Sequence, residues 1–230
     1  MLKYKCLVLD HDDTVVKSTK EIHFPSFKRT IAEVKPQLKI TEEDFVTNCF
    51  DPGFFDYMEK ILGFTEAEMA YQLESWLKYI EDKIPAAYDG IADVIHRQRE
   101  EGGLVCVVSH SYSEIIKRDY TSRFGCLPDR IYGGEEPEER RKPSVFPIVD
   151  IMRAFSLDKK DIVVVDDLLP GLKMATAAGV DFMCAGWSHS VKKIADYMRA
   201  ESGVYLETTG ELYARLFYEK SPVSHINGTL

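Results

Sequence analysis

Three short runs of the sequence are almost wholly apolar and rich in β-branched residues, and they constrain the fold more than any other feature. They are residues 5–9 (KCLVL), 104–108 (LVCVV) and 162–165 (IVVV). Apolar side chains on both faces of a strand are typical of a parallel sheet that helices cover on both sides. Weaker strands are expected at residues 131–132, 182–185 and 204–206.

Segments with helical spacing of apolar residues alternate with these strands. They cover residues 90–101, 113–124, 145–155, 171–178, 190–200 and 210–219. Gly179 and Gly203 stand where helix ends favour a residue that tolerates positive φ. The alternation predicts an α/β fold with a Rossmann-like, doubly wound parallel sheet.

Residues 17–87 interrupt this alternation, because they show helical patterns and no convincing strand. Thr41 and Thr65 mark helix starts, and the second begins a full capping box, Thr-Glu-Ala-Glu. The block therefore predicts an all-helical cap domain of residues 17–87, inserted into a core of residues 1–16 and 88–230. The cap is expected to be built around a stripe of aromatic residues, Phe45, Phe50, Phe54, Phe55 and Tyr57.

Charge and cysteine content exclude several classes of protein. Asp and Glu number 38 against 29 Lys and Arg, a net charge of −9 without a basic run, so neither nucleic acid nor an anionic membrane is an expected partner. The sequence shows neither the long apolar run of a membrane span nor the shorter one of a signal peptide. Its five scattered cysteines form no zinc or disulfide pattern. We therefore expect a soluble cytoplasmic protein, and the oligomeric state stays open.

Polar residues follow each of the three strong strands. The segments are Asp10-His11-Asp12-Asp13-Thr14, Ser109-His110-Ser111 and Asp166-Asp167. Because the carboxyl ends of parallel strands meet at one edge, the carboxylates of Asp10, Asp12, Asp166 and Asp167 are expected to converge there, with Ser109 beside them. Clustered carboxylates repel each other unless a cation neutralises them, and all-oxygen ligands favour a hard cation, usually Mg²⁺ where substrate phosphate completes the shell.

Lys142 adds a positive charge to this set. It is expected to open a helix, with Pro143 near the first helical position, and to reach the same edge. The set then holds an acidic nucleophile, a second carboxyl acid, a hydroxyl, an ammonium and a magnesium site. Such groups suit phosphoryl transfer through an acyl phosphate.

In their order along the chain, these motifs resemble those of the haloacid dehalogenase-like (HAD) superfamily. The matching residues are Asp10-x-Asp12-x-Thr14, Ser109, Lys142-Pro143 and Asp166-Asp167. The long helical block after the first motif is similar to the C1 cap class. The resemblance implies that Asp10 attacks phosphorus, and that Asp12 protonates the leaving oxygen and then activates the hydrolytic water.

The resemblance also implies the ligands of phosphate and metal. Thr14, Ser109 and Lys142 would hold phosphoryl oxygens. Mg²⁺ would be bound by Asp10, Asp166 and the backbone carbonyl of Asp12, with Asp167 acting directly or through water. The sequence departs from the family pattern at Asp13, where glycine is common, and at residues 168–171, which lack a frequent third carboxylate.

The predicted activity is Mg²⁺-dependent hydrolysis of a small phosphorylated metabolite. A phosphosugar mutase is an alternative, because Glu21-Ile22-His23-Phe24 resembles the first cap helix of β-phosphoglucomutase. Glu21 and His23 would then touch substrate or act at the hinge, although an amphipathic helix face explains them equally well. A non-catalytic ligand-binding protein on the same fold is a third possibility.

Simpler structural roles stay open for the same residues. The aspartates and Ser109 could be helix caps or turn formers, and Lys142 could be an ordinary solvated lysine. His11 and His110 could be polar loop residues without a catalytic task, because aspartates already fill the acid–base roles.

Overall fold

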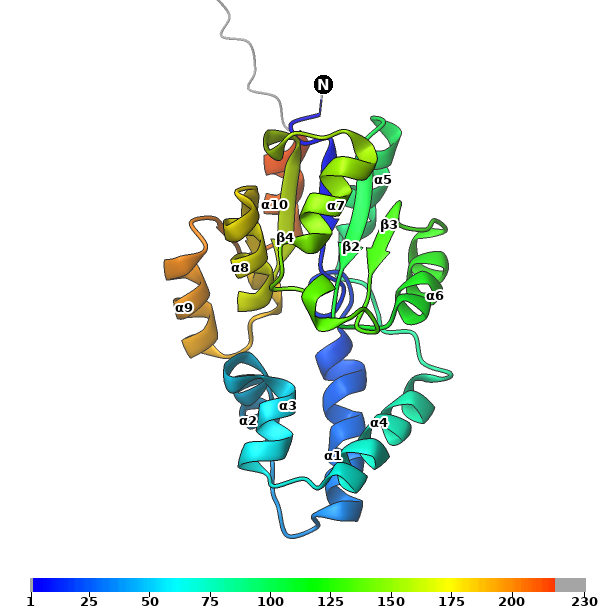
Figure 1. The fold of residues 1–230 in the computed structure, drawn as a ribbon, viewed down its shortest axis with the longest axis vertical. Helices are drawn as coiled ribbons and strands as arrows, with labels where there is room; N and C mark the ends of the chain where they lie inside the picture. Colours follow the sequence, from blue (N-terminus) through cyan, green and yellow to red (C-terminus); the bar gives the residue numbers. More distant parts are fainter. Residues whose placement is uncertain (1, 218–230) are drawn as a thin grey trace, which may run out of the picture.

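Six parallel strands form the centre of this computed structural model, which describes residues 2–217 (Figure 1). Their order across the sheet is β3-β2-β1-β4-β5-β6, so the first strand of the chain pairs with both β2 and β4. The strands are β1 (Cys6–Leu9), β2 (Leu104–Val108), β3 (Arg130–Tyr132), β4 (Ile162–Asp166), β5 (Asp181–Ala185) and β6 (Tyr205–Leu206). All the strands expected from the sequence, strong and weak, are thereby confirmed.

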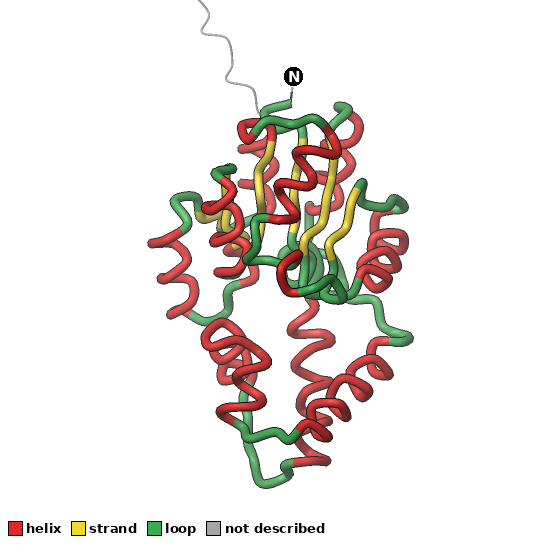
Figure 2. Tube along the Cα trace, viewed as in Figure 1, coloured by secondary structure: helices red, strands yellow, loops and turns green. Residues whose placement is uncertain are grey.

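Helices cover both faces of the sheet, as Figure 2 shows. Side chains alternate along each strand, so that Leu7 and Leu9 face one helical layer while Cys6 and Val8 face the other. The first layer consists of α5 (Ile91–Glu100), α6 (Ser113–Phe124) and α10 (Thr209–Phe217). The second consists of α7 (Phe146–Phe155), α8 (Leu169–Ala178) and α9 (Lys192–Glu201). The predicted doubly wound α/β fold is confirmed; the last two residues of the helix expected at 210–219 lie outside the described residues.

The start of α7 differs from the prediction. Lys142 does not open this helix, and Pro143 is not its first residue, because both lie in the loop that follows the short helix η4 (Glu138–Arg140). Helix α7 begins at Phe146 with Pro147 in its first turn, and the Ser144 hydroxyl accepts the Phe146 N–H at 3.2 Å. A proline suits the first turn of a helix, and this segment offers two, so the pattern alone selected the wrong one.

The chain between β1 and β2 is helical, as expected. It contains α1 (Phe24–Val34), α2 (Glu42–Asn48), α3 (Phe54–Asp56) and α4 (Glu66–Ile80), with the wider helical turns η1 (Thr19–His23), η2 (Cys49–Gly53) and η3 (Tyr57–Ile61). Both expected helix starts are confirmed, because the hydroxyls of Thr41 and Thr65 accept N–H groups three residues on, at 3.1 and 3.3 Å.

This helical segment has an apolar cluster of its own, separate from the two clusters on the sheet. Its buried members are Phe27, Ile31, Phe45, Tyr57, Met58 and Phe64. The expected aromatic stripe is only partly correct, because Phe55 is 66% exposed and Phe50 packs against Tyr197 of α9 instead. The non-helical backbone at Asp51 (φ −151°) separates Phe50 from the helical residues that follow it. A separate apolar cluster supports a distinct cap, whose limits at residues 17 and 87 stay a prediction.

The structure was also searched for helices able to cross a bilayer. None of those within residues 2–217 combines the length and the hydropathy that a span requires.

Candidate active site

The polar residues that follow the strands meet at one edge of the sheet. Asp10 continues β1, and its N–H donates to the Val165 carbonyl of β4 at 2.9 Å. Ser109 continues β2 and donates its N–H to the Tyr132 carbonyl of β3 at 3.0 Å. These ladder bonds extend the sheet by one residue, and they carry the side chains of both residues to the edge that Asp166 reaches at the end of β4.

Lys142 lies at the centre of this edge. Its Nζ atom is 2.6 Å from Asp10 Oδ1 and 2.6 Å from Asp166 Oδ2, and its side chain is 5% exposed. Burial opposes the charge of this amine, but the two carboxylates outweigh it and raise the pKa of Lys142 above its usual range. The ring of His110 contacts the Lys142 carbonyl oxygen at 3.1 Å, which joins the two loops. Lys142 is therefore a buried cation of the site and not a solvated surface lysine.

Three buried carboxylates beside Lys142 form a group suited to a metal ion. Asp10, Asp166 and Asp167 each present an oxygen within 4.8 Å of the others. Asp167 Oδ1 is buried without a hydrogen-bond partner among the described residues. Burial raises the pKa of Asp166 to about 6, against the influence of Lys142, and burial followed by the charge of Asp166 raises the pKa of Asp167. One ammonium does not satisfy three buried carboxylates, so these residues fit a hard divalent cation.

Gly171 lies directly against Asp166. A Cβ atom at this position would lie 2.2 Å from Asp166 Oδ2. The carboxylate of Asp166 thus occupies the space that a side chain at position 171 would need.

The helix-cap alternatives are wrong for Asp167 and Ser109. The residue preceding α8 is Leu168, whose N–H donates to Asp166 Oδ1 at 2.8 Å. The residue preceding α6 is Tyr112, three positions after Ser109. The side chains of Asp167 and Ser109 are instead buried at the strand ends.

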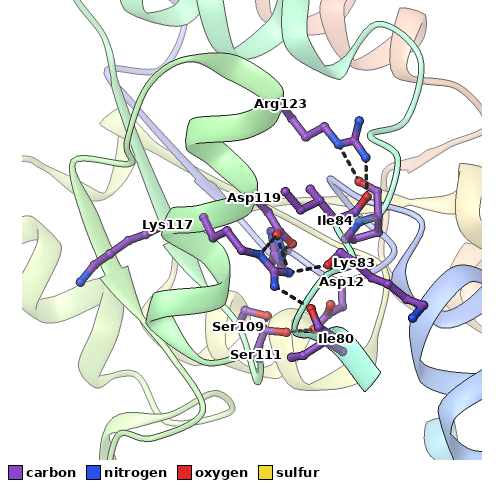
Figure 3. Close-up of polar contacts among 12 residues, drawn as sticks. Asp12, Ile80, Lys83, Ile84, Ser109, Ser111, Lys117, Asp119 and Arg123 are labelled. Atoms are coloured by element: carbon purple, nitrogen blue, oxygen red, sulfur yellow. Dashed lines mark hydrogen bonds and ion pairs between the residues drawn. The ribbon is translucent and has the colours of Figure 1, made fainter. Parts of the chain in front are cut away.

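Asp12 points toward the cap. Its Oδ2 accepts the Ser111 hydroxyl at 2.6 Å (Figure 3), and its Oδ1 lies 3.1 Å from Nε2 of His23 in η1. Trp76 of α4 donates its indole N–H to His23 Nδ1 at 3.1 Å, which leaves the Nε2–H of His23 directed at the carboxylate. Burial opposes ionisation of Asp12, but His23 and Ser111 overcome it and hold the pKa of Asp12 well below its usual range. Asp12 therefore contacts the core through Ser111 and the cap through His23.

The other predicted residues of the first motif and of the cap have different surroundings. Thr14 is fully buried and its hydroxyl has no partner among the described residues, while its carbonyl accepts the Trp187 indole N–H at 3.2 Å. The carboxylate of Glu21 accepts the Ala86 N–H at 2.8 Å, a contact between the two segments that join the cap to the core, which fits the predicted role at the hinge. Asp13 stands where the family commonly has glycine and adopts a left-handed backbone, φ 56°. Its carboxylate accepts the Thr19 N–H at 3.1 Å.

Asp119, Trp187 and His189 lie around the site and were not predicted from the sequence. His189 contacts the Asp167 carbonyl oxygen through Nε2 at 2.8 Å, and His11 Nε2 lies 3.1 Å from Asp119 inside the core. Trp187 and His189 follow β5, so the rule that strand ends carry function, applied to this weaker strand, would have found them. No sequence signal pairs His11 with Asp119, which is 108 residues away.

Comparison with known proteins places this geometry in a wider context. The sequence model of the haloacid dehalogenase-like hydrolases matches residues 7–185. No curated protein is similar enough to count as a match.

Three solved structures illustrate the likeness of the fold. A haloacid dehalogenase-like hydrolase from Bacteroides fragilis has a TM-score of 0.76 and 18% identity, over 91% of this chain and 100% of that one. A predicted phosphoglycolate phosphatase from Haemophilus somnus has a TM-score of 0.72 and 16% identity, over 94% and 99%. CbbY from Rhodobacter sphaeroides, solved with phosphate, has a TM-score of 0.71 and 19% identity, over 91% and 96%.

Proposed function

The chain belongs to the haloacid dehalogenase-like hydrolase family, and from this premise we propose that it is a Mg²⁺-dependent phosphatase of small phosphomonoesters. The observation that carries the proposal is the contact of Lys142 with both Asp10 and Asp166 at 2.6 Å, beside Ser109 and Asp167. A nucleophile, a buried cation and a carboxylate group suited to a metal thus share one sheet edge. The two sheet-edge carboxylates nearest Lys142 come from different strands, 156 residues apart along the chain.

In the first step, the Asp10 carboxylate attacks phosphorus and the ester P–O bond breaks, which yields an aspartyl-phosphate. The buried Lys142 ammonium and the hydroxyls of Ser109 and Thr14 bind the phosphoryl oxygens and offset the charge that develops on them. The hydroxyl of Thr14 has no hydrogen-bond partner within residues 2–217, which supports its part in this set.

Asp12 moves the protons of both steps. In its protonated form it gives a proton to the leaving oxygen as the ester bond breaks, and as the carboxylate, the form that His23 favours, it then accepts a proton from the water that attacks the aspartyl-phosphate. Hydrolysis breaks the bond between Asp10 and phosphorus and releases inorganic phosphate. The contacts with Ser111 and His23 orient the Asp12 carboxylate for this exchange.

Asp10, Asp166 and Asp167, with the backbone carbonyl of Asp12, are the residues that would hold Mg²⁺. When bound, this ion offsets negative charge on the transferring phosphoryl group and on the carboxylates around it. The orphaned oxygen of Asp167 and the raised pKa of Asp166 support a cation at this place.

The decisive experiment measures phosphate release from a panel of phosphorylated metabolites, with Mg²⁺ and with EDTA. Asp10→Asn removes the nucleophile and is expected to abolish release, while Asp89→Asn, at a fully exposed carboxylate, keeps the wild-type rate. Full activity of Asp10→Asn or in EDTA would refute the mechanism. Absence of release across the whole panel would favour the non-catalytic ligand-binding alternative.

A phosphosugar mutase is the second candidate, and the contact of His23 with Asp12 is the observation that favours it. A mutase must return the phosphoryl group to its substrate before water reaches it, so contacts from the cap to the acid–base residue gain importance. Interconversion of sugar phosphate isomers, stimulated by a sugar bisphosphate and without net phosphate release, would establish the mutase.

A further inference from the structure

The segment that returns the chain from α4 to the core is bound by two arginines of α6, Arg118 and Arg123, of which Figure 3 labels Arg123. Arg118 donates to the carbonyls of Ile80 and Lys83, each at 2.8 Å. Arg123 donates to the Pro85 carbonyl at 2.8 Å and also to that of Ile84. An extended loop is thus held to the core through its backbone, in a way that does not depend on its side chains.

Arg118 differs from Arg123 because it also contacts a buried carboxylate. Its Nε donates to Asp119 Oδ1 at 2.9 Å, and the Asp119 side chain is only 1% exposed. The other oxygen of Asp119 lies 3.1 Å from His11 Nε2. His11 stands between the two catalytic aspartates of the first motif, so one chain of contacts joins the loop, Arg118, Asp119 and the turn that carries Asp10 and Asp12.

This chain of contacts borders the space beside Asp12. The cavity there measures about 10 Å³ and is lined by residues of the cap, of the returning loop and of α6, among them Trp76, Ile80 and Arg118. Such a volume holds about one water molecule. A group larger than a water molecule therefore enters this cavity only after the lining residues have moved.

We propose that Arg118 is a positioning residue with two effects. It binds the returning loop, residues 81–85, to the core, which we call the fastening. It also couples the closed cap to the turn of Asp10 and Asp12 through Asp119 and His11, which we call the coupling. The coupling to catalysis rests on the proposed function, whereas the fastening of the loop does not. When the cap opens, the carbonyls of Ile80 and Lys83 leave the guanidinium. When it closes, Arg118 binds them again and the carboxylate of Asp119 keeps the planar guanidinium in place.

Limited proteolysis tests the fastening without any substrate. Trypsin cleaves after Lys83, an exposed residue of the loop, only when the surrounding backbone detaches from the core. Arg118→Ala is expected to speed cleavage of the Lys83–Ile84 bond by about tenfold, with fragments identified by mass. Lys117→Ala is the matched control, because Lys117 precedes Arg118 on α6, pairs with Glu114 and points away from the loop in Figure 3. It is expected to keep the wild-type cleavage rate.

Asp119→Asn tests the coupling separately. This variant keeps the bonds from Arg118 to the two carbonyls but removes the carboxylate between Arg118 and His11. We expect Lys83 to stay protected while kcat falls about tenfold and KM changes little, because the misplaced group belongs to the turn and not to a substrate contact. A purely structural role would instead lower the thermal midpoint and leave the kcat of the folded fraction unchanged.

The outcomes separate the two parts of the proposal. Wild-type protection of Lys83 in Arg118→Ala, or cleavage as fast in Lys117→Ala as in Arg118→Ala, would overturn the fastening. Wild-type kcat in Asp119→Asn would overturn the coupling. If circular dichroism shows that Arg118→Ala does not fold, Arg118→Lys replaces it in the test. A lysine retains the charge beside Asp119, but it cannot donate to two carbonyls and a carboxylate from one planar group. Cleavage of Arg118→Lys faster than that of the wild type supports the fastening, and cleavage at the wild-type rate overturns it. An inactive wild-type protein would refute the proposed phosphatase, and the proteolysis result would still stand.

Discussion

The position of Gly171 leads to a sharp prediction about the proposed metal site. A Cβ atom there would lie 2.2 Å from Asp166 Oδ2, whereas a carbon and an oxygen that do not bond need more than 3 Å. Gly171→Ala therefore forces the Asp166 carboxylate to move by about 1 Å, and a displacement of that size in a catalytic group costs about 100-fold in rate. The movement also strains the contact of Asp166 with Lys142 at 2.6 Å.

Two opposing effects decide the stability of this variant. Replacing a glycine inside a helix by alanine stabilises the helix by about 0.5–1 kcal/mol. Forcing a side chain into an occupied core position costs about 1–3 kcal/mol, so the net change is a loss of about 0–2.5 kcal/mol in the free energy of unfolding. Gly171→Ala thus folds, but with a displaced Asp166.

The assay follows hydrolysis of a generic phosphomonoester as Mg²⁺ is titrated, together with urea unfolding. We expect kcat to fall about 100-fold and the Mg²⁺ concentration at half-maximal rate to rise about tenfold. Gly210→Ala in α10 is the matched control, because the nearest atom to its new Cβ lies 3.7 Å away. A Gly171→Ala protein with wild-type kcat and wild-type Mg²⁺ dependence would refute the reasoning.

Other substitutions test the surroundings of the site and the cap. His23→Ala removes the partner that lowers the pKa of Asp12, so the Asp12 carboxyl keeps its proton to higher pH. The alkaline limb of the pH–rate profile is therefore expected to move to higher pH, and an unmoved limb contradicts the role of His23 in setting this pKa. Trp187→Phe removes the 3.2 Å bond to the Thr14 carbonyl and is expected to cost about 1 kcal/mol in urea unfolding, which wild-type stability would disprove. Thr65→Ala removes an exposed helix cap and should lower the free energy of unfolding by about 1 kcal/mol with unchanged kcat, whereas a fall in kcat would argue against a purely local effect.

The strands and the residues that follow them were predictable because both are local features. A run such as Ile162-Val163-Val164-Val165 has no polar face, so it must be buried on both sides. Once parallel strands are expected, the shared direction of their ends brings Asp10, Ser109 and Asp166 to one edge without any knowledge of contacts. The roles assigned to these residues stay proposals that the variants above test.

The errors arose where a local pattern permits more than one outcome. Pro143 and Pro147 both suit the first turn of a helix, and only the folded chain shows that α7 begins at Phe146 with Pro147 in its first turn. Phe50 and Phe55 belong to an aromatic stripe by spacing, but a bend at Asp51 directs Phe50 to α9 and leaves Phe55 exposed.

The sequence by itself determined the class of fold and which polar residues share a sheet edge, because hydrophobic periodicity and strand direction are properties of short segments. Tertiary structure alone decided the partners of the buried charges. The ion pairs of Lys142 and the contact of His11 with Asp119 join residues more than 20 positions apart. A buried charge must find its counterion in space, and distance along the chain carries no information about which counterion that is.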